Sequence, residues 1–177
     1  IRAEGFLRTI YLYPMALSFI VTGTAWRWML NPSLGIEKFA QDLGFVNFTF
    51  DWLVTPGMSI YTIVIAGVWQ SSGFIMAIFL AGLRSVDDEI IKAAKIDGAS
   101  LVSVYTKIIL PMMRPVFMSA IVILVHLAIK SYDLVIALTA GGPGISSDMP
   151  AVFMTQMAFH RSEIGLASAS AIMMFLT

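Results

Sequence analysis

Residues 58–83 read MSIYTIVIAGVWQSSGFIMAIFLAGL. A helix needs about 20 predominantly apolar residues to cross the roughly 30 Å hydrocarbon core of a bilayer, and this stretch meets that length. A helix is the expected form because backbone polar groups inside lipid must pair within their own segment. Further apolar stretches occupy about residues 9–30, 115–138 and 164–177, and the sequence ends within the last of them. The pattern predicts an all-α, polytopic bundle of membrane-spanning helices.

The overall composition also favours a membrane protein. Hydrophobic residues make up 58% and charged residues 12% of the 177, with a mean hydropathy of +0.85, whereas soluble domains carry about 25% charged residues. The formal net charge is zero, which gives no reason to expect a nucleic-acid partner. The sequence begins at Ile1 without an initiator Met and stops at Thr177 inside an apolar run. We therefore expect residues 1–177 to be a fragment of one transmembrane domain.

Basic residues predict the orientation of the spans. Residues 1–8 and 84–114 hold most of them: Arg2, Arg8, Arg84, Lys92, Lys95, Lys107 and Arg114. By contrast, residues 31–57 contain only Lys38 and residues 139–163 only Arg161. Positively charged loops stay in the cytoplasm, so residues 84–114 are predicted to be cytoplasmic and the other two loops periplasmic.

The cytoplasmic segment 84–114, which we call the elbow, includes SVDDEIIKAAKIDGASLVSVYTKIILP over residues 85–111. Ser85 and Asp88 fit a capping box at the start of a helix, and Gly98 is a natural stop for it. A second short helix is predicted to run to about residue 109, before Pro111 breaks it. Its apolar residues form one stripe at helical spacing: Leu101, Val104, Tyr105 and Ile108. Such a hairpin could lie on lipid headgroups or fit a groove on a partner protein.

The elbow resembles the "EAA" loop of the permease subunits of binding-protein-dependent ABC importers, whose pattern is E-A-A, two residues, D-G-A, then I-x-L-P and a later P. The matching residues are Ala93-Ala94, Asp97-Gly98-Ala99, Ile108, Leu110-Pro111 and Pro115. The flanking residues resemble sugar-type members of the maltose and carbohydrate uptake family: Trp69, Leu80-Ala81-Gly82-Leu83, Tyr132-Asp133-Leu134, residues 139–144 (TAGGPG) and Gly165-Leu166-Ala167-Ser168-Ala169. These matches cover nearly the whole sequence in order.

The resemblance implies the permease fold of type I ABC importers and a coupling role for the elbow. In this family the loop fits a cleft on a separate ATPase and passes the closure of the ATPase to the spans. The residues implied in coupling are Ala93, Ala94, Asp97, Gly98, Ala99, Leu101, Tyr105, Leu110 and Pro111. One position departs from the pattern, since Lys92 stands where the family usually has Glu. A salt bridge made by that Glu is not carried over, although Glu89, one turn earlier, could substitute.

Polar residues within the predicted spans are candidates for a substrate path, because ionisable groups in a membrane are costly and often functional. His126, Lys130 and Asp133 lie at i, i+4 and i+7 in the third span, with Tyr132 beside them. Lys130 and Asp133 could instead extend to the outer interface. Trp69, Gln70 and Ser72 form a second cluster, in which an aromatic face and hydrogen-bonding groups suit a sugar, although small residues there could simply pack helices.

No phosphate-binding motif of the form G-x-x-x-x-G-K-[ST], metal-ligand cluster or nucleophile–base pair is evident in the sequence. The chain is therefore predicted to have no cofactor or metal and to be no enzyme by itself. The resemblance implies a multi-pass permease of the bacterial inner membrane that passes a sugar or polyol by alternating access. The implied partners are ATPase subunits, a second homologous permease, a periplasmic binding protein and membrane lipid. An ion-coupled secondary transporter is the alternative, but it would call for paired acidic residues at mid-span.

Overall fold

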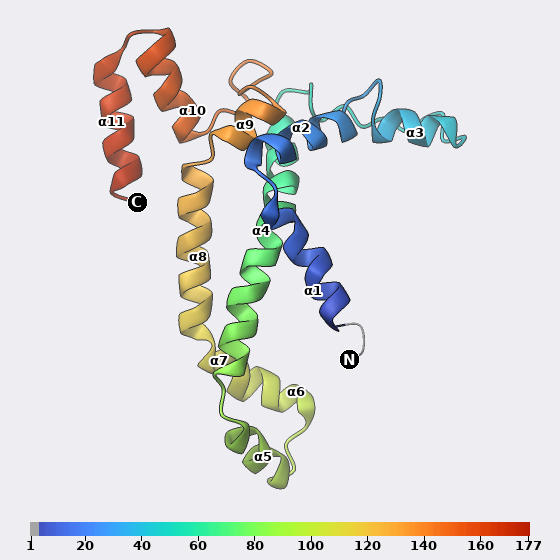
Figure 1. Ribbon diagram of the computed structural model, residues 1–177, viewed down its shortest axis with the longest axis vertical. Helices are drawn as coiled ribbons and strands as arrows, with labels where there is room; N and C mark the ends of the chain where they lie inside the picture. The colour runs from blue at the N-terminus through green and yellow to red at the C-terminus, as the bar shows by residue number, and fades with distance from the viewer. Residues whose placement is uncertain (1–3) are drawn as a thin grey trace.

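The structure, a computed structural model, describes residues 4–177, and this part of the chain contains helices and no strand. The helices α4 (Ser59–Arg84) and α8 (Arg114–Ile129) contact each other and run along the long axis (Figure 1). Within the described residues, α4 is the one helix long and apolar enough to cross a membrane unaided. Its 26 residues give a length of about 39 Å. The predicted span 58–83 coincides with this helix to within one residue at each end.

The first predicted span, residues 9–30, is wrong as a single helix. It divides into α1 (Glu4–Leu12), the 3-10 helix η1 (Tyr13–Ala16) and α2 (Phe19–Met29), with a bend of 102° between its two halves. Pro14 lies at the start of η1 and has no N–H with which to continue the ladder of α1. Leu17 is extended, and the Ser18 hydroxyl then accepts a hydrogen bond from the Val21 N–H to start α2.

The third predicted span, residues 115–138, is also interrupted. Helix α8 ends at Ile129, and residues 130–132 turn the chain into α9 (Asp133–Leu138), which packs against α2 near the end of α4 that lies opposite the elbow (Figure 1). Leu134, Val135 and Leu138 of α9 are almost fully buried. Their hydrophobicity therefore serves a protein core rather than contact with lipid. If each bent helix pair counts as one crossing, the described residues provide up to three spans.

The main core lies where α4, α9 and α10 (Pro150–Thr155) meet. Ile63 and Ala66 of α4 pack with the buried side of α9 and with Val152 of α10. Helix α2 approaches α9 very closely at Gly23, where an added Cβ would lie 2.7 Å from the Cβ of Ala137. The two folded-back segments thus form one packed layer at this end of the molecule.

The predicted loops lie at opposite ends of the molecule (Figure 1). The elbow holds α5 (Asp88–Ile96), α6 (Leu101–Val104), a π-helical turn (Tyr105–Ile109) and α7 (Leu110–Met112). At the other end, α3 (Ile36–Asp42) projects sideways, and the loop 139–149 covers the core. A hairpin of α10, a π-helical turn (Gln156–His160) and α11 (Ile164–Phe175) completes the chain. At 12 residues, α11 is apolar but shorter than a full crossing requires.

Candidate coupling elbow and translocation pocket

The N-cap of the first elbow helix is Asp87, so the predicted capping box of Ser85 and Asp88 is wrong. The Asp87 carboxylate accepts a hydrogen bond of 2.8 Å from the Glu89 N–H. The Ser85 hydroxyl instead donates to the Gly82 carbonyl at 2.7 Å, at the end of α4. Asp88 and Glu89 occupy the first turn, where their negative charges interact favourably with the helix dipole.

The predicted glycine turn between the two elbow helices is confirmed. Gly98 has φ of +79°, a conformation that side-chain-bearing residues rarely adopt. Ser100 follows it, and the Ser100 hydroxyl accepts a hydrogen bond from the Ser103 N–H to start α6. Both elbow helices are therefore capped by their own side chains, which fixes the hairpin without a partner.

The elbow has a small core of its own, and that core departs from the predicted stripe. Val104 and Ile109 are buried with Val86 and Met113, and Ala94 and Ala99 pack against the cluster. Leu101 and Tyr105 are exposed, and Ile108 is only partly buried. A π-helical turn, in which the Leu110 N–H donates to the Tyr105 carbonyl, accounts for the burial of Ile109 rather than Ile108. Since this turn is wider than an α-helical one, residues five apart share the buried side.

Pro111 does not break the second elbow helix, contrary to the prediction. Helical backbone continues through α7 to Met112, and the chain bends by 60° only between this point and α8. Pro111 is the second residue of α7, directly after the π-helical turn in which the Leu110 N–H bonds to the Tyr105 carbonyl. The elbow is thus joined to α8 by a short bend.

The elbow exposes several large apolar side chains. Ile96 is 86%, Leu101 66% and Val102 71% exposed, and Tyr105 is about half exposed. Of the other predicted coupling residues, most are exposed and three are partly buried: Ala93, Asp97, Gly98 and Leu110 in the first group, and Ala94, Ala99 and Pro111 in the second. Lys92 is exposed and makes no ion pair within the described residues. This exposed apolar surface is what a groove-binding helix pair presents to a partner.

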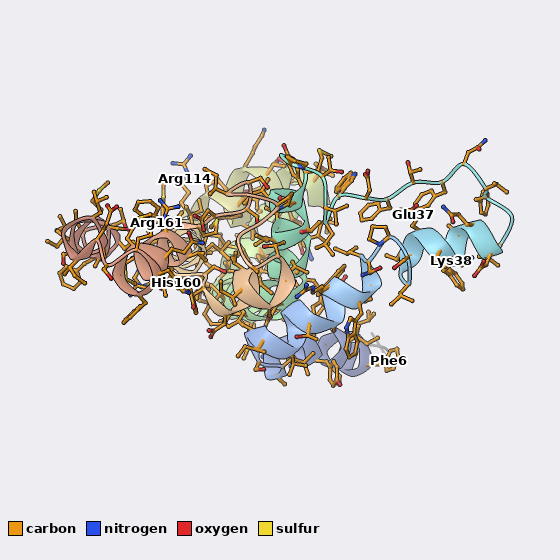
Figure 2. The ribbon with its side chains drawn as sticks, turned by 90° about the horizontal axis from the view of Figure 1, so that it is seen from above. Phe6, Glu37, Lys38, Arg114, His160 and Arg161 are labelled. Atoms are coloured by element: carbon orange, nitrogen blue, oxygen red, sulfur yellow. The ribbon has the colours of Figure 1, made fainter. Side chains whose placement is uncertain are left out.

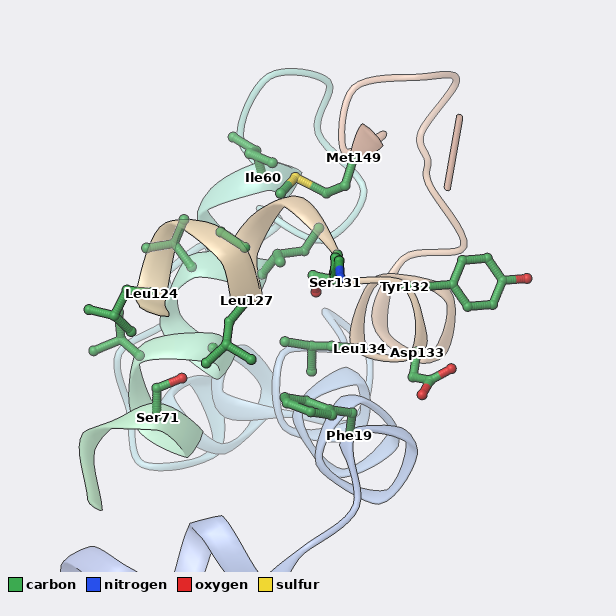
Figure 3. Close-up of a pocket in the computed structure, with 16 residues that line it drawn as sticks. Phe19, Ile60, Ser71, Leu124, Leu127, Ser131, Tyr132, Asp133, Leu134 and Met149 are labelled. Atoms are coloured by element: carbon green, nitrogen blue, oxygen red, sulfur yellow. The ribbon is translucent and has the colours of Figure 1, made fainter. Parts of the chain in front are cut away.

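A cavity of about 450 Å³ lies between α4, α8 and α9. Its wall is mostly apolar, with Phe19, Val64, Leu127 and Leu134 among the lining residues. Ser71, Lys130 and Ser131 bring polar groups to it. In Figure 3 the ring of Tyr132 and the carboxylate of Asp133 point away from the middle of the cavity. A second cavity of about 430 Å³ lies beyond Lys130 and Tyr132, against α10 and α11.

The predicted substrate-path residues do not converge on one site. Lys130, Tyr132 and Asp133 line the first cavity, whereas His126 lines neither cavity and is exposed on α8. Since α8 ends at Ile129, His126 and Asp133 do not share one helical face as the sequence spacing suggested. Lys130 and Asp133 form no ion pair within 4 Å among the described residues.

The cluster predicted from Trp69, Gln70 and Ser72 is also separated. The ring of Trp69 makes an edge-on contact with Trp26 of α2, with centroids 5.8 Å apart. Gln70 is buried, and its Nε2 donates to the Leu17 carbonyl at 2.8 Å. The Ser72 hydroxyl donates to the Trp69 carbonyl of its own helix. Trp69 and Gln70 therefore hold the first bent span against α4, whereas Ser72 makes no contact of this kind.

The sequence reasoning missed a polar network in the outer loop. Ser147 is fully buried, and its hydroxyl donates to Thr139 and to the Gly142 carbonyl, each at 2.8 Å. The Ser59 and Ser146 hydroxyls are 2.9 Å apart and tie the loop to the start of α4. Beside them, one buried carboxylate oxygen of Asp148 has no hydrogen-bond partner, and burial raises the pKa of Asp148. The glycine-rich stretch 139–144 was the one signal of this ordered turn.

Residues 2–177 match the family described as "Binding-protein-dependent transport system inner membrane component". The chain belongs to this family. It is 39% identical over 177 residues to a probable ABC transporter permease of Pyrococcus horikoshii, with 99% of this chain and 61% of that protein covered. It is 36% identical over 178 residues to the xylose/arabinose import permease XacH of Haloferax volcanii, with 99% and 56% covered.

A third relative in the family is the trehalose/maltose transport permease MalF of Thermococcus litoralis, which is 31% identical over 176 residues, with 99% of this chain and 59% of that protein covered. The chain thus spans between 56% and 61% of the length of these three relatives. A solved bacterial ABC transporter involved in import of the acidic polysaccharide alginate has the same fold. It superimposes with a TM-score of 0.81 at 20% identity over 98% of this chain and 62% of that one. The predicted ABC importer permease fold is confirmed.

Proposed function

We propose that the chain is the membrane-embedded core of a sugar-importing ABC permease whose elbow docks on a separate ATPase. The supporting observation is the exposure of the large apolar side chains Ile96, Leu101 and Val102 in the elbow. The elbow's own core does not use these side chains. Large apolar side chains exposed at the tip of a solvent-facing hairpin are typical of a surface that binds another protein.

The proposed mechanism is alternating access. Closure of an ATPase dimer would draw the elbows of this chain and of a second, homologous permease together. The elbow is continuous with α8 through a short bend, and its core residues Val86 and Met113 adjoin the ends of α4 and α8. Displacement of the elbow would therefore move both long helices and change access to the cavity between them.

The proposed substrate is a sugar or related polyol delivered by a periplasmic binding protein. Several relatives carry sugar names, such as xylose/arabinose and trehalose/maltose. One structural neighbour was solved in complex with an alginate pentasaccharide-bound periplasmic protein. In this chain, Lys130, Ser71 and Ser131 provide the few polar groups at the cavity wall, and such groups orient a ligand in an otherwise apolar site.

Co-purification of the ATPase with the full-length permease tests the coupling role. We expect Leu101→Asp to abolish co-purification, because a charge would enter an apolar contact. The fold should persist, since Leu101 is exposed and an acid suits the first turn of α6. Leu101→Met is the matched control and should retain the ATPase. Undiminished ATPase recovery with the aspartate variant would refute docking through this surface.

A further inference from the structure

A second exposed apolar surface lies at the end of the molecule opposite the elbow. It belongs to residues 34–54, which leave α2, include α3 and return to α4; we call this segment the outer arm. Its large apolar side chains that are more than half exposed are Leu34, Phe39, Leu43, Phe45, Val46 and Val54. The geometry points to a lipid surface as their partner: we propose that the outer arm lies on the outer leaflet with its apolar side among the headgroups and the ends of the acyl chains.

The outer arm has a defined shape. Glu37 of α3 accepts hydrogen bonds from the Phe50 N–H at 2.9 Å and from the Gln41 side chain at 3.2 Å. The Gln41 amide also donates to the Phe48 carbonyl at 3.2 Å. These bonds hold the returning segment beside α3, so that the arm is a closed, flat loop, seen from above in Figure 2.

The two remaining sides of α3 differ in character. Successive residues of a helix are about 100° apart. Glu37 and Gln41 lie on the side that faces the returning segment. About 100° around the helix from them lie Lys38 and Asp42, which form an ion pair at 2.7 Å. The opposite side carries only apolar residues: Ile36, Phe39, Ala40 and Leu43. Such a division between a charged and an apolar side is typical of helices that lie in a membrane interface.

The handedness of α3 determines which side faces the membrane. In Figure 2, α3 runs outward with the returning segment beside it, viewed from the end opposite the elbow. In a right-handed helix so placed, Lys38 and Asp42 face the viewer. By the same spacing, Leu43 and Ile36 face the other way, toward the level occupied by the long helices, and Phe39 faces sideways, away from the returning segment. The charged pair thus meets water, and the apolar side meets the level of the bilayer.

The base of the arm lies at the depth where headgroups are expected. The rings of Phe50 and Trp52 stack with centroids 4.9 Å apart, and Trp52 lies 6.2 Å from Tyr61, in the first turn of α4. Aromatic residues gather at the membrane–water interface. Because the arm joins α4 at this aromatic cluster and extends sideways (Figure 1), it runs along the interface rather than away from it.

Spin labelling of the full-length permease complex in vesicles of phosphatidylethanolamine and phosphatidylglycerol tests this placement. The 177 residues contain no cysteine. With any cysteine elsewhere in the complex replaced by serine, nitroxide labels can be placed singly at Phe39→Cys and Leu43→Cys, with Lys38→Cys as the matched control on the same helix. Collisions with oxygen, which concentrates in lipid, should dominate at positions 39 and 43. Collisions with a water-soluble nickel chelate should dominate at position 38.

Two outcomes would overturn the proposal. Immobilised labels at 39 and 43 that are shielded from both oxygen and nickel would show that protein covers the arm, whether a binding protein or another part of the permease. Nickel accessibility at 39 and 43 equal to that at 38 would place the whole arm in water. Neither the ATPase nor the substrate enters this measurement, so its result is independent of the proposed function.

Discussion

At the scale of single residues, Gln70 makes a bent span compatible with a membrane. Its side chain pairs with the Leu17 carbonyl, where residues 17 and 18 leave the helical ladder. We expect Gln70→Leu to leave this carbonyl unpaired and to lower the free energy of unfolding by about 1 kcal/mol. Thermal unfolding in detergent measures this. Ser72→Ala is the control, because the Ser72 hydroxyl bonds only to its own helix; equal melting temperatures for the two variants would contradict the role of Gln70.

Substitutions at Gly98 test how much the left-handed backbone conformation at this position matters for the elbow. A Cβ added there would meet no atom within 4 Å, so the cost of a side chain is the left-handed backbone itself, about 1–2 kcal/mol. We expect Gly98→Arg to disrupt the turn and reduce ATPase co-purification. Gly98→Asn should largely preserve it, because Asn tolerates positive φ. Full ATPase recovery with the arginine variant would show that the turn does not matter for docking.

Asp148 is expected to make the stability of the loop 139–149 depend on pH. Burial raises its pKa above the usual 3.8, and the nearby Arg161 partly opposes this shift. The folded state therefore binds a proton more readily than the unfolded chain, so the loop gains stability as the pH falls from neutral through the raised pKa, and the gain is complete below the usual value. Asp148→Asn should remove this contribution to the pH dependence. Melting temperatures across that pH range, compared with the parent protein, check the expectation; an unchanged slope would contradict it.

At the scale of elements, the contact between α2 and α9 depends on one glycine. In Gly23→Ala the new Cβ would lie 2.7 Å from the Cβ of Ala137 and 3.0 Å from the Leu134 carbonyl oxygen. Since overpacking costs about 1–3 kcal/mol, we expect a lower melting temperature. Gly67→Ala on α4 is the control, because its nearest neighbour, a methyl group of Leu134, is 3.7 Å away. A harmless Gly23→Ala would indicate that the two helices can separate freely.

The elements that the sequence predicted well are those with local signals. Helix α4 is long and uniformly apolar, and the elbow turn carries Gly98 at a position that needs positive φ. The bends near Pro14 and at residues 130–132 were missed. An apolar composition does not distinguish a helix that faces lipid from one buried in protein, and α9 is of the second kind.

The candidate site was predicted less well than the fold. Spacing along an assumed continuous helix grouped His126 with Asp133, and the break after Ile129 separates them. Adjacent residues such as Trp69 and Gln70 point in different directions on a helix, so their proximity in sequence does not make a common site. The π-helical turn in the elbow likewise has no sequence signal and changes which residues are buried there.

At the scale of the whole molecule, the two ends are expected to lie on opposite sides of the membrane. Lys95 belongs to the elbow and Lys38 to the outer arm, at the other end. A membrane-impermeant maleimide applied to intact cells should therefore label Lys38→Cys and leave Lys95→Cys unlabelled until the cells are opened. Labelling of Lys95→Cys from outside would overturn the assigned orientation and the docking proposal with it.

The interlocked contact of Gly23 with Ala137 also constrains how the outer end can open. Helices α2 and α9 are each joined to a long helical segment by only two or three non-helical residues, and each is packed more tightly on the other than on α4. Two helices that are packed together and connected by short non-helical segments are expected to move as one rigid unit. If the chain works as the permease proposed above, α2 and α9 would move together, with the chain bending at residues 17–18 and 130–132.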